Sequence, residues 1–152
     1  MIAVIQRISG ARLTADGIYR GDVGTGLYIL LGVTREDSSE DAVRLAEKIS
    51  KLRIFSDENG KMNLSLLDID GEAMVVSNFT LCANYSHGNR PEYFSAAQPE
   101  SAIPLYECFV KELSSRVRRV VTGVFGADMK TELNTDGPVT IVMDSALLGR
   151  KK

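Results

Sequence analysis

The chain has 152 residues, of which 44% are hydrophobic and 25% charged, and its formal net charge is −2 at pH 7. This length and composition are typical of one globular domain, and they exclude a disordered chain. The slight excess of acidic residues excludes extended binding along a nucleic-acid backbone, which needs an excess of Lys and Arg. We predict a single domain over residues 1–148, followed by a short basic tail at residues 149–152.

The sequence has no segment with the pattern of a targeting signal or a membrane span. Residues 1–7 alternate like a strand and lack the long apolar stretch of a secretory signal. The two cysteines, Cys82 and Cys108, stand outside any CxxC or Cys/His spacing, which is typical of free thiols in a reducing compartment. We therefore predict a cytoplasmic protein without membrane association.

The first third of the chain has the pattern of strands joined by tight turns. Asp16-Gly17 is a hairpin signal between two of these strands. Residues 27–31 are too uniformly apolar for an exposed strand, so we expect a central strand with both faces covered. The predicted strands are residues 2–8, 11–15, 18–20 and 27–33.

An amphipathic helix is predicted next. Ser38 and Ser39 can cap its start, and apolar side chains then recur on one face while charged residues fill the other. The apolar positions are Ala42, Leu45, Ala46, Ile49 and Leu52. This pattern indicates a helix that packs on the sheet. It is followed by a strand at 53–56, a turn at 57–60, an extended segment at 61–67, a turn at 70–71 and a buried strand at 73–79.

The second half contains the same mixture of elements. Residues 82–91 are rich in Asn, Ser and Gly and form a predicted loop at the end of a strand, a place where functional residues are common. A second helix is predicted over residues 99–116, because Ile103, Tyr106, Phe109, Val110 and Leu113 share one face. Further strands are predicted at 120–125, 129–133 and 139–143. Together these elements indicate a mixed α/β fold.

Two short segments point to a site built mainly from backbone groups. Residues 77–81 end a buried strand, so the Thr80 hydroxyl and nearby amides released from the sheet can form a pocket for an anion or a carbonyl. Gly137-Pro138 stands directly before an apolar run, where Pro cannot donate a hydrogen bond to a sheet. Both segments also have structural explanations, since Ser and Thr at strand ends usually bond local backbone groups and a trans Gly-Pro turn is common.

The reactive side chains exclude several common mechanisms. His87 is the only histidine and lies in the predicted loop, so a Ser or Thr nucleophile has no evident base. One histidine and two separated cysteines do not form the usual metal-ligand spacings. Gly21, Gly24 and Gly26 lie between strands instead of before a helix, unlike a phosphate-binding loop. We predict no cofactor and no metal.

Seven motifs are spread over nearly the whole chain. They are AVIQR (3–7), LRIF (52–55), GKMNLS (60–65), VSNFTL (76–81), GNRP (88–91), TGVFGADM (122–129) and DGPVT (136–140). In this order and spacing, the chain resembles the family of D-aminoacyl-tRNA deacylases.

This resemblance implies a twisted, barrel-like fold of mostly antiparallel β-sheets, with two amphipathic helices packed outside, and a homodimer. It also implies a metal-independent esterase that releases a D-amino acid, or glycine mischarged on tRNA-Ala, from the acceptor end of tRNA. In the family the Gly-Pro bond is cis, and its loop enters the partner subunit's pocket, where main-chain carbonyls exclude L side chains. The implied function is chiral proofreading.

The same resemblance assigns roles to ten residues. The catalytic set is Ser77, Asn78, Phe79 and Thr80, and the set for binding and chiral selection is Gly137, Pro138, Arg7, Ala102, Phe125 and Met129. The Phe79 and Thr80 amides would hold an oxyanion, and the substrate 2′-OH would help to activate water. The Thr80 hydroxyl would have a supporting role in hydrolysis. Arg7 would brace the Gly-Pro loop. The alternatives are an ion pair for Arg7 and core or helix packing for Ala102, Phe125 and Met129.

Two positions depart from the family pattern. Asn78 stands where the family usually has Gln, and Thr135 stands where it has Asn. Asn78 is one methylene shorter and Thr135 lacks an amide, so the contacts of both side chains should differ. These changes leave open a second hypothesis, a dimer that binds aminoacyl-tRNA ends with weak catalysis. An editing domain for L-aminoacyl esters is disfavoured, because such domains usually bring metal-ligand clusters.

Overall fold

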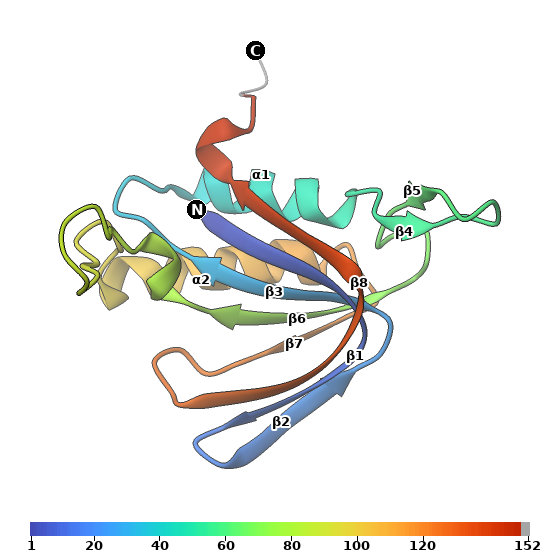
Figure 1. Cartoon of the computed structure of the whole chain (residues 1–152), viewed down its shortest axis with the longest axis horizontal. Coiled ribbons are helices and arrows are strands. Elements are labelled where there is room, and N and C mark those ends of the chain that lie inside the picture. Colours follow the sequence, from blue (N-terminus) through green and yellow to red (C-terminus); the bar gives the residue numbers. More distant parts are fainter. Residues whose placement is uncertain (150–152) are drawn as a thin grey trace.

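The computed structural model describes residues 1–149 and confirms the mixed α/β fold (Figure 1). One six-stranded sheet has the order β2-β1-β3-β6-β7, and β8 pairs with β1. Its strands are β1 (Ile2–Ala15), β2 (Ile18–Val23), β3 (Gly26–Gly32), β6 (Glu72–Ser77), β7 (Arg119–Thr122) and β8 (Met129–Asp144). A small separate sheet joins β4 (Phe55–Ser56) to β5 (Met62–Leu64). The helices are α1 (Ser39–Ser50), α2 (Pro99–Ser114) and the 3-10 turns η1 (Phe79–Cys82) and η2 (Ser145–Leu147).

The long strand β1 organises the sheet, because its two halves have different neighbours. Residues 2–8 pair with β3 and residues 11–15 pair with β2, whereas β8 pairs with β1 along both halves. These three pairings are antiparallel, and β3–β6 and β6–β7 are parallel. At the far edges, a Cβ placed on Gly21 of β2 would lie only 3.1 Å from Val121 Cγ1 of β7. The sheet is therefore nearly closed, as the barrel-like prediction requires.

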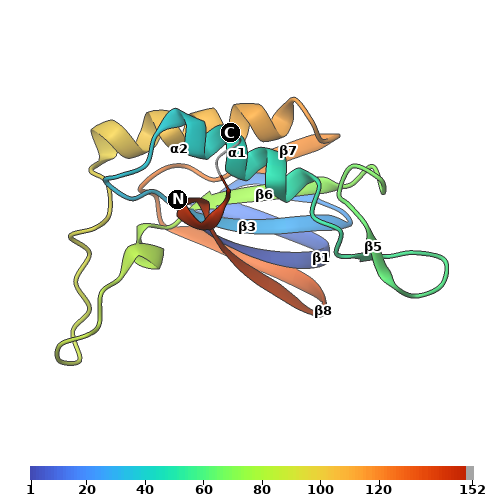
Figure 2. The ribbon, with the colours of Figure 1, turned by 90° about the horizontal axis from the view of Figure 1, so that it is seen from above.

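Two apolar cores lie on opposite faces of this sheet, because side chains along a strand alternate between faces. Both helices cover one face, as Figure 2 shows. On that face Leu27 and Ile29 of β3 pack in a core with Leu45 of α1 and Phe109 of α2, all fully buried. On the other face Tyr28 and Met74 belong to a second core inside the curved sheet. The predicted central strand and the two packed helices are confirmed.

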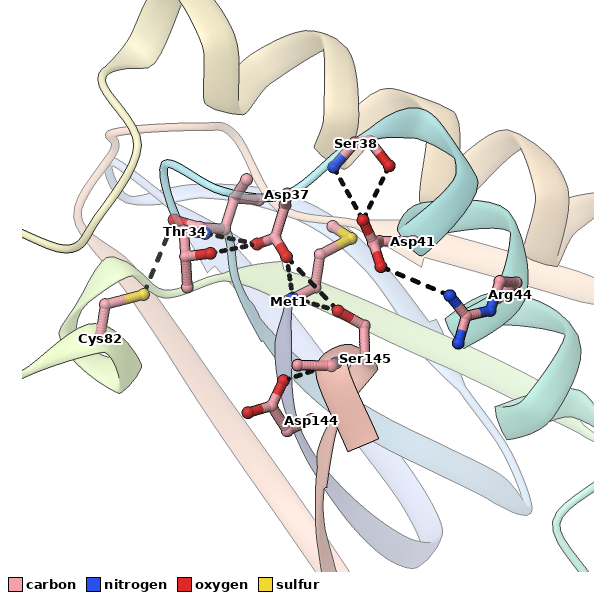
Figure 3. A network of polar contacts seen from close by, with 11 residues as sticks. Met1, Thr34, Asp37, Ser38, Asp41, Arg44, Cys82, Asp144 and Ser145 are labelled. Atoms are coloured by element: carbon pink, nitrogen blue, oxygen red, sulfur yellow. Dashed lines mark hydrogen bonds and ion pairs between the residues drawn. The ribbon is translucent and has the colours of Figure 1, made fainter. Parts of the chain in front are cut away.

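A polar network ties both ends of the described chain to the connection between β3 and α1 (Figure 3). The Asp37 carboxylate accepts hydrogen bonds from the Thr34 amide at 2.6 Å and the Thr34 hydroxyl at 2.9 Å. The same carboxylate pairs with the amino group of Met1, which also donates to the Ser145 hydroxyl. Met1 and Asp37 are nearly fully buried, so this charge pair is shielded from solvent.

Several predicted boundaries were wrong where long-range pairing overrides local sequence. The predicted strands 2–8 and 11–15 are one strand, β1, and the predicted strands 129–133 and 139–143 are one strand, β8. Gly137-Pro138 thus lies within β8, at a bulge, and does not open a strand. The buried strand β6 ends at Ser77, and Phe79 begins the 3-10 turn η1. The basic tail falls mostly on residues 150–152, outside the described residues. None of the helices within residues 1–149 is long and apolar enough to cross a membrane.

Candidate active site

A cavity of about 210 Å³ opens at the carboxyl ends of the parallel strands β3 and β6. In sheets with parallel strands this end is the usual place for a ligand. Four parts of the chain meet here: the end of β3, the β6–η1 junction, the start of α2 and the connection from β7 to β8. The lining residues are Leu31, Val33, Ser77, Asn78, Phe79, Ala97, Ala102, Phe125, Gly126, Ala127 and Met129.

Six of the ten predicted site residues line this cavity, although they come from distant parts of the sequence. They are Ser77, Asn78, Phe79, Ala102, Phe125 and Met129. Thr80 directly follows Phe79 on η1. A larger cavity of about 530 Å³ runs along α1 and is lined by charged side chains of both signs, but it contains none of the predicted residues. The smaller cavity is therefore the candidate active site.

The Asn78 side chain turns back onto Thr80 and caps the η1 turn. Its Oδ1 accepts a hydrogen bond from the Thr80 amide at 3.2 Å and another from the Thr80 hydroxyl at 2.5 Å. The Thr80 amide is thus already engaged, and the Thr80 hydroxyl proton points at a carboxamide instead of a base. The Phe79 amide is the first of the turn, a position whose N–H has no partner inside the turn. Of the two predicted oxyanion donors, Phe79 is the one left available by this geometry.

Aromatic rings form the walls around this backbone site. The Phe79 ring is 57% exposed and packs edge-to-face on Tyr93, with ring centroids 5.1 Å apart. Phe125 packs on Tyr106 of α2 at 6.3 Å, and the Tyr106 hydroxyl donates to the Val75 carbonyl at 2.9 Å. Burial raises the pKa of Tyr106 well above its usual range. Tyr106 is therefore a structural donor that fixes the wall, and it holds its proton at neutral pH.

The titratable side chains near the cavity do not form a nucleophile–base pair. Cys82 ends η1, is buried, and donates from Sγ to the Val33 carbonyl at 3.6 Å (Figure 3). Burial raises the pKa of this thiol, which disfavours the reactive thiolate. His87 lies in the exposed loop beyond η1, where its Nδ1 is 2.8 Å from the Ser86 hydroxyl. Among residues 1–149, no group of three or more His, Cys, Asp or Glu side chains could hold a metal ion.

The remaining predicted residues, Arg7, Gly137 and Pro138, form a separate group at the bulge of β8. Arg7 Nε donates to the Asp136 carbonyl at 3.0 Å and lies 3.1 Å from the Asp136 carboxylate. Its Nη1 donates to the Ile54 carbonyl at 2.7 Å. The Gly137–Pro138 bond is cis, and both residues are exposed. None of the three lines the cavity, so the single chain does not bring the two predicted groups together.

Part of the cavity wall was not predicted from the sequence. Ala97 and Val33 line it, and the Ala97 amide donates to the Val33 carbonyl at 2.9 Å. Both are ordinary apolar residues, so no local signal marks them. Gly126 and Ala127, in contrast, lie inside the TGVFGADM motif and follow directly from the predicted Phe125.

Comparison with known proteins identifies the family. The family model described as "D-Tyr-tRNA(Tyr) deacylase" matches residues 4–144. The chain belongs to this deacylase family. A protein named D-aminoacyl-tRNA deacylase from Chloroflexus aurantiacus is 55% identical over 148 residues, covering 97% of this chain and 92% of the relative. A protein of the same name from Flavobacterium johnsoniae is 51% identical over 146 residues, covering 95% and 97%.

Two solved structures share the fold of this chain. A protein described as "c-Myc DNA Unwinding Element Binding Protein" is 36% identical and superposes with a TM-score of 0.88, covering 95% of this chain and 98% of that chain. A structure described as a "probable eukaryotic D-amino acid tRNA deacylase" has a TM-score of 0.81 over 93% and 97%. At 14% identity this second likeness concerns the fold alone. The family match over residues 4–144 includes the residues of both the cavity and the β8 bulge.

Proposed function

We propose that this deacylase-family member hydrolyses the ester bond of D-aminoacyl-tRNA, releasing the free D-amino acid and tRNA in the cytoplasm. Glycine mischarged on tRNA-Ala is the second substrate of the same activity. The observation that carries the proposal is the cavity itself, which gathers six predicted residues from two separate motifs and from α2 in a chain of this family.

The size of the cavity supports a site completed by a second copy of the chain. About 210 Å³ is smaller than the range of roughly 300–1,000 Å³ that is typical of small-molecule sites. An aminoacyl group joined to adenosine does not fit inside it completely. We infer that the ester end enters the cavity of one protomer and that the Gly137–Pro138 bulge of the other protomer closes over it in a homodimer.

Chiral selection in this proposal works by steric exclusion. A Cβ on Gly137 would lie 2.1 Å from the Val139 amide nitrogen, so the backbone has no room for a side chain there. A main chain held this tightly can present carbonyl oxygens at a fixed position and exclude the side chain of an L-amino acid, whatever that side chain is. Glycine has no side chain to exclude, which is why it is accepted as well.

Hydrolysis in this proposal uses backbone and substrate groups. The Phe79 amide donates to the developing oxyanion, while Asn78 holds the η1 turn through Thr80. The Thr80 hydroxyl has no base beside it, so it supports the turn and is not the nucleophile. The ribose 2′-OH of the substrate assists the attacking water. Ser77, Phe125, Met129 and Ala102 line the space for the aminoacyl and adenosine groups, and no metal is required.

The competing function is a dimeric binder of aminoacyl-tRNA ends with weak catalysis. The engagement of the Thr80 amide by Asn78 favours it, because that contact removes one oxyanion donor. The two functions differ in turnover, so a direct assay separates them.

The test is to incubate the purified protein, with a chelator present, with D-tyrosyl-tRNA and L-tyrosyl-tRNA and to follow release of free tyrosine. We expect rapid hydrolysis of the D ester alone. Slow release from both esters, with tight binding of the charged tRNA, would support the binder instead. Loss of D-ester hydrolysis on adding chelator, with recovery on adding a divalent metal, would contradict metal independence.

A further inference from the structure

The loop of residues 83–95, between η1 and α2, has an unusually aromatic surface. The structure exposes four aromatic side chains within residues 1–149, and two of them lie in this loop: Tyr85 at 78% and Phe94 at 71%. A third, Phe79 at 57%, stands just before the loop, and the fourth, Tyr19, lies on β2. Exposed apolar groups gathered in one place are typical of a surface that a partner covers.

This 83–95 loop has a defined shape. Asn84 and Glu92 exchange backbone hydrogen bonds of 2.8 and 2.9 Å, and the Asn84 side chain donates to the Glu92 carboxylate at 2.6 Å. The base is fixed where the Ser95 hydroxyl donates to the Cys82 carbonyl at 2.7 Å. Figure 2 shows the loop projecting away from the sheet and helices. The aromatic rings are therefore carried on a preformed projection.

The loop carries the kinds of side chain that surfaces for single-stranded nucleic acid use. Such surfaces combine exposed rings, on which bases stack, with cationic side chains that contact phosphates. Here Tyr85 and Phe94 supply the rings, Arg90 is an exposed cation, and the Glu92 carboxylate is occupied by Asn84. The overall acidity of the chain does not oppose this, because only a few nucleotides would be bound.

The loop is also continuous with the candidate active site. Phe79 lines the cavity and packs on Tyr93 of the loop, and the chain leaving the loop reaches Ala97 on the opposite wall. A strand of nucleic acid whose last nucleotide enters the cavity would therefore have its preceding nucleotides beside the loop.

We propose that the 83–95 loop binds the unpaired nucleotides that precede the terminal adenosine of the tRNA. Tyr85 and Phe94 stack on bases, and Arg90 contacts a phosphate. The inference rests on the proposed function, since it is the same tRNA end that enters the cavity.

The experiment compares the variants Tyr85→Ala, Phe94→Ala and the double variant with the control Tyr19→Ala, which removes an exposed ring from β2. Each is assayed on D-tyrosyl-tRNA and on 3′-O-D-tyrosyl-adenosine, which lacks the preceding nucleotides. We expect kcat/KM on the tRNA to fall by about fivefold or more for each ring removed. Activity on the adenosine ester should not change, and Tyr19→Ala should behave like the unmodified protein on both substrates.

Two other results would overturn the proposal. Equal losses on both substrates would mean that the loop shapes the cavity, and unchanged activity on tRNA would mean that the rings touch no nucleotide. Sedimentation of the double variant is a third check, because dissociation into monomers would make the loop a subunit contact. Binding of a fluorescent, uncharged RNA ending in CCA is measured in parallel. Binding of this RNA reports on the loop even if the unmodified protein hydrolyses neither ester. Hydrolysis of neither ester would defeat the proposed function, whereas weaker RNA binding by the double variant would still support the role of the loop.

Discussion

The cavity at the end of β6 and the bulge of β8 are built in opposite ways. The cavity is concave, and four parts of the chain form its walls. The bulge is exposed, and the single side chain of Arg7 holds it through the carbonyls of Asp136 and Ile54. The cavity offers a backbone amide and apolar walls, and the bulge offers an exposed backbone that Arg7 contacts. In the proposed site, each region supplies what the other lacks.

The strand that joins the two regions explains why one chain does not unite them. Met129 lines the cavity at the start of β8, and Gly137 stands eight residues further along the same strand. Extended backbone of that length covers roughly 25 Å. The bulge is therefore held at a distance from the cavity of its own chain, and the proposed site requires the bulge of a second copy.

The largest effect is expected from Gly137→Ala. Because the new Cβ would lie 2.1 Å from the Val139 nitrogen, the bulge has to move. We expect the ratio of D-ester to L-ester hydrolysis to fall by about a hundredfold, since displacements of about 1 Å in a positioning group have effects of this size. The assay is release of tyrosine from the two charged tRNAs.

Gly24→Ala is the matched control for Gly137→Ala. A Cβ on Gly24 meets nothing nearer than a Glu72 carboxylate oxygen at 3.9 Å, so the backbone can stay in place. Its selectivity should equal that of the unmodified protein. Unchanged selectivity in Gly137→Ala as well would separate the bulge from chiral selection.

A smaller effect is expected from Arg7→Ala, which leaves the bulge sequence intact but removes its brace. The side chain is only 12% exposed, and the Ile54 carbonyl would lose a charged donor. We expect the free energy of unfolding to fall by about 1–3 kcal/mol. D-ester hydrolysis should fall about tenfold as the bulge loosens.

Arg12→Ala is the control for the brace. Arg12 is 56% exposed and pairs with Asp22, and water and salt screen such an exposed pair, so its loss should leave the free energy of unfolding nearly unchanged. Chemical denaturation measures the free energy of unfolding, and the tyrosine-release assay measures D-ester hydrolysis. Similar losses of activity for Arg7→Ala and Arg12→Ala would contradict a specific role for Arg7.

On the cavity side, Thr80→Val tests whether the hydroxyl is the nucleophile. The change removes the hydrogen bond to Asn78 Oδ1 but keeps the Thr80 amide. If the hydroxyl only supports the η1 turn, kcat should fall by less than about tenfold, because one such hydrogen bond contributes about 1 kcal/mol. A loss of about a thousandfold, restored by Thr80→Ser, would identify the hydroxyl as the nucleophile and overturn the backbone mechanism.

The smallest effect concerns acid stability and lies outside both regions. The Asp68 carboxylate accepts hydrogen bonds from the Ser65 hydroxyl and amide at 2.6 and 2.7 Å, which lower its pKa. A lowered folded-state pKa gives stability that is present above the unfolded value of about 3.9 and is lost as the pH falls through the folded value. Melting temperatures should therefore be flat near neutral pH and fall below about pH 4. In Asp68→Asn this fall should be shallower, and an equal fall would show that Asp68 does not contribute.

The sequence predicted features that depend on neighbours in the chain. Asp16 and Gly17 both have positive φ, as the hairpin signal requires, and Ser38 is the residue that caps α1. The contact of Asn78 with Thr80 is equally local, and a short carboxamide two residues before an amide is a known source of such turns. The sequence did not predict this contact, because Asn78 was compared only with the longer Gln of the family pattern.

Features that depend on distant pairing could not be predicted from the sequence alone. Ser9 and Gly10 resemble a break between strands, yet β1 continues through them because β8 pairs on both sides of the irregularity. The same pairing places Gly137-Pro138 within a strand. Six of the eleven lining residues were predicted, five of them within motifs, but the wall at Val33 and Ala97 depends on a contact across more than sixty residues.

The most direct test of a site shared between two chains is subunit mixing. Ala102→Trp fills the cavity and keeps the bulge, whereas Gly137→Ala keeps the cavity and displaces the bulge. Each variant alone should lack rapid D-selective hydrolysis. After the two are unfolded, mixed and refolded together, mixed dimers contain one intact cavity facing one intact bulge. We predict that D-selective hydrolysis reappears in the mixture. Activity that stays at the level of the separate variants, with mixed dimers demonstrated by mass spectrometry, would contradict a site built from two chains.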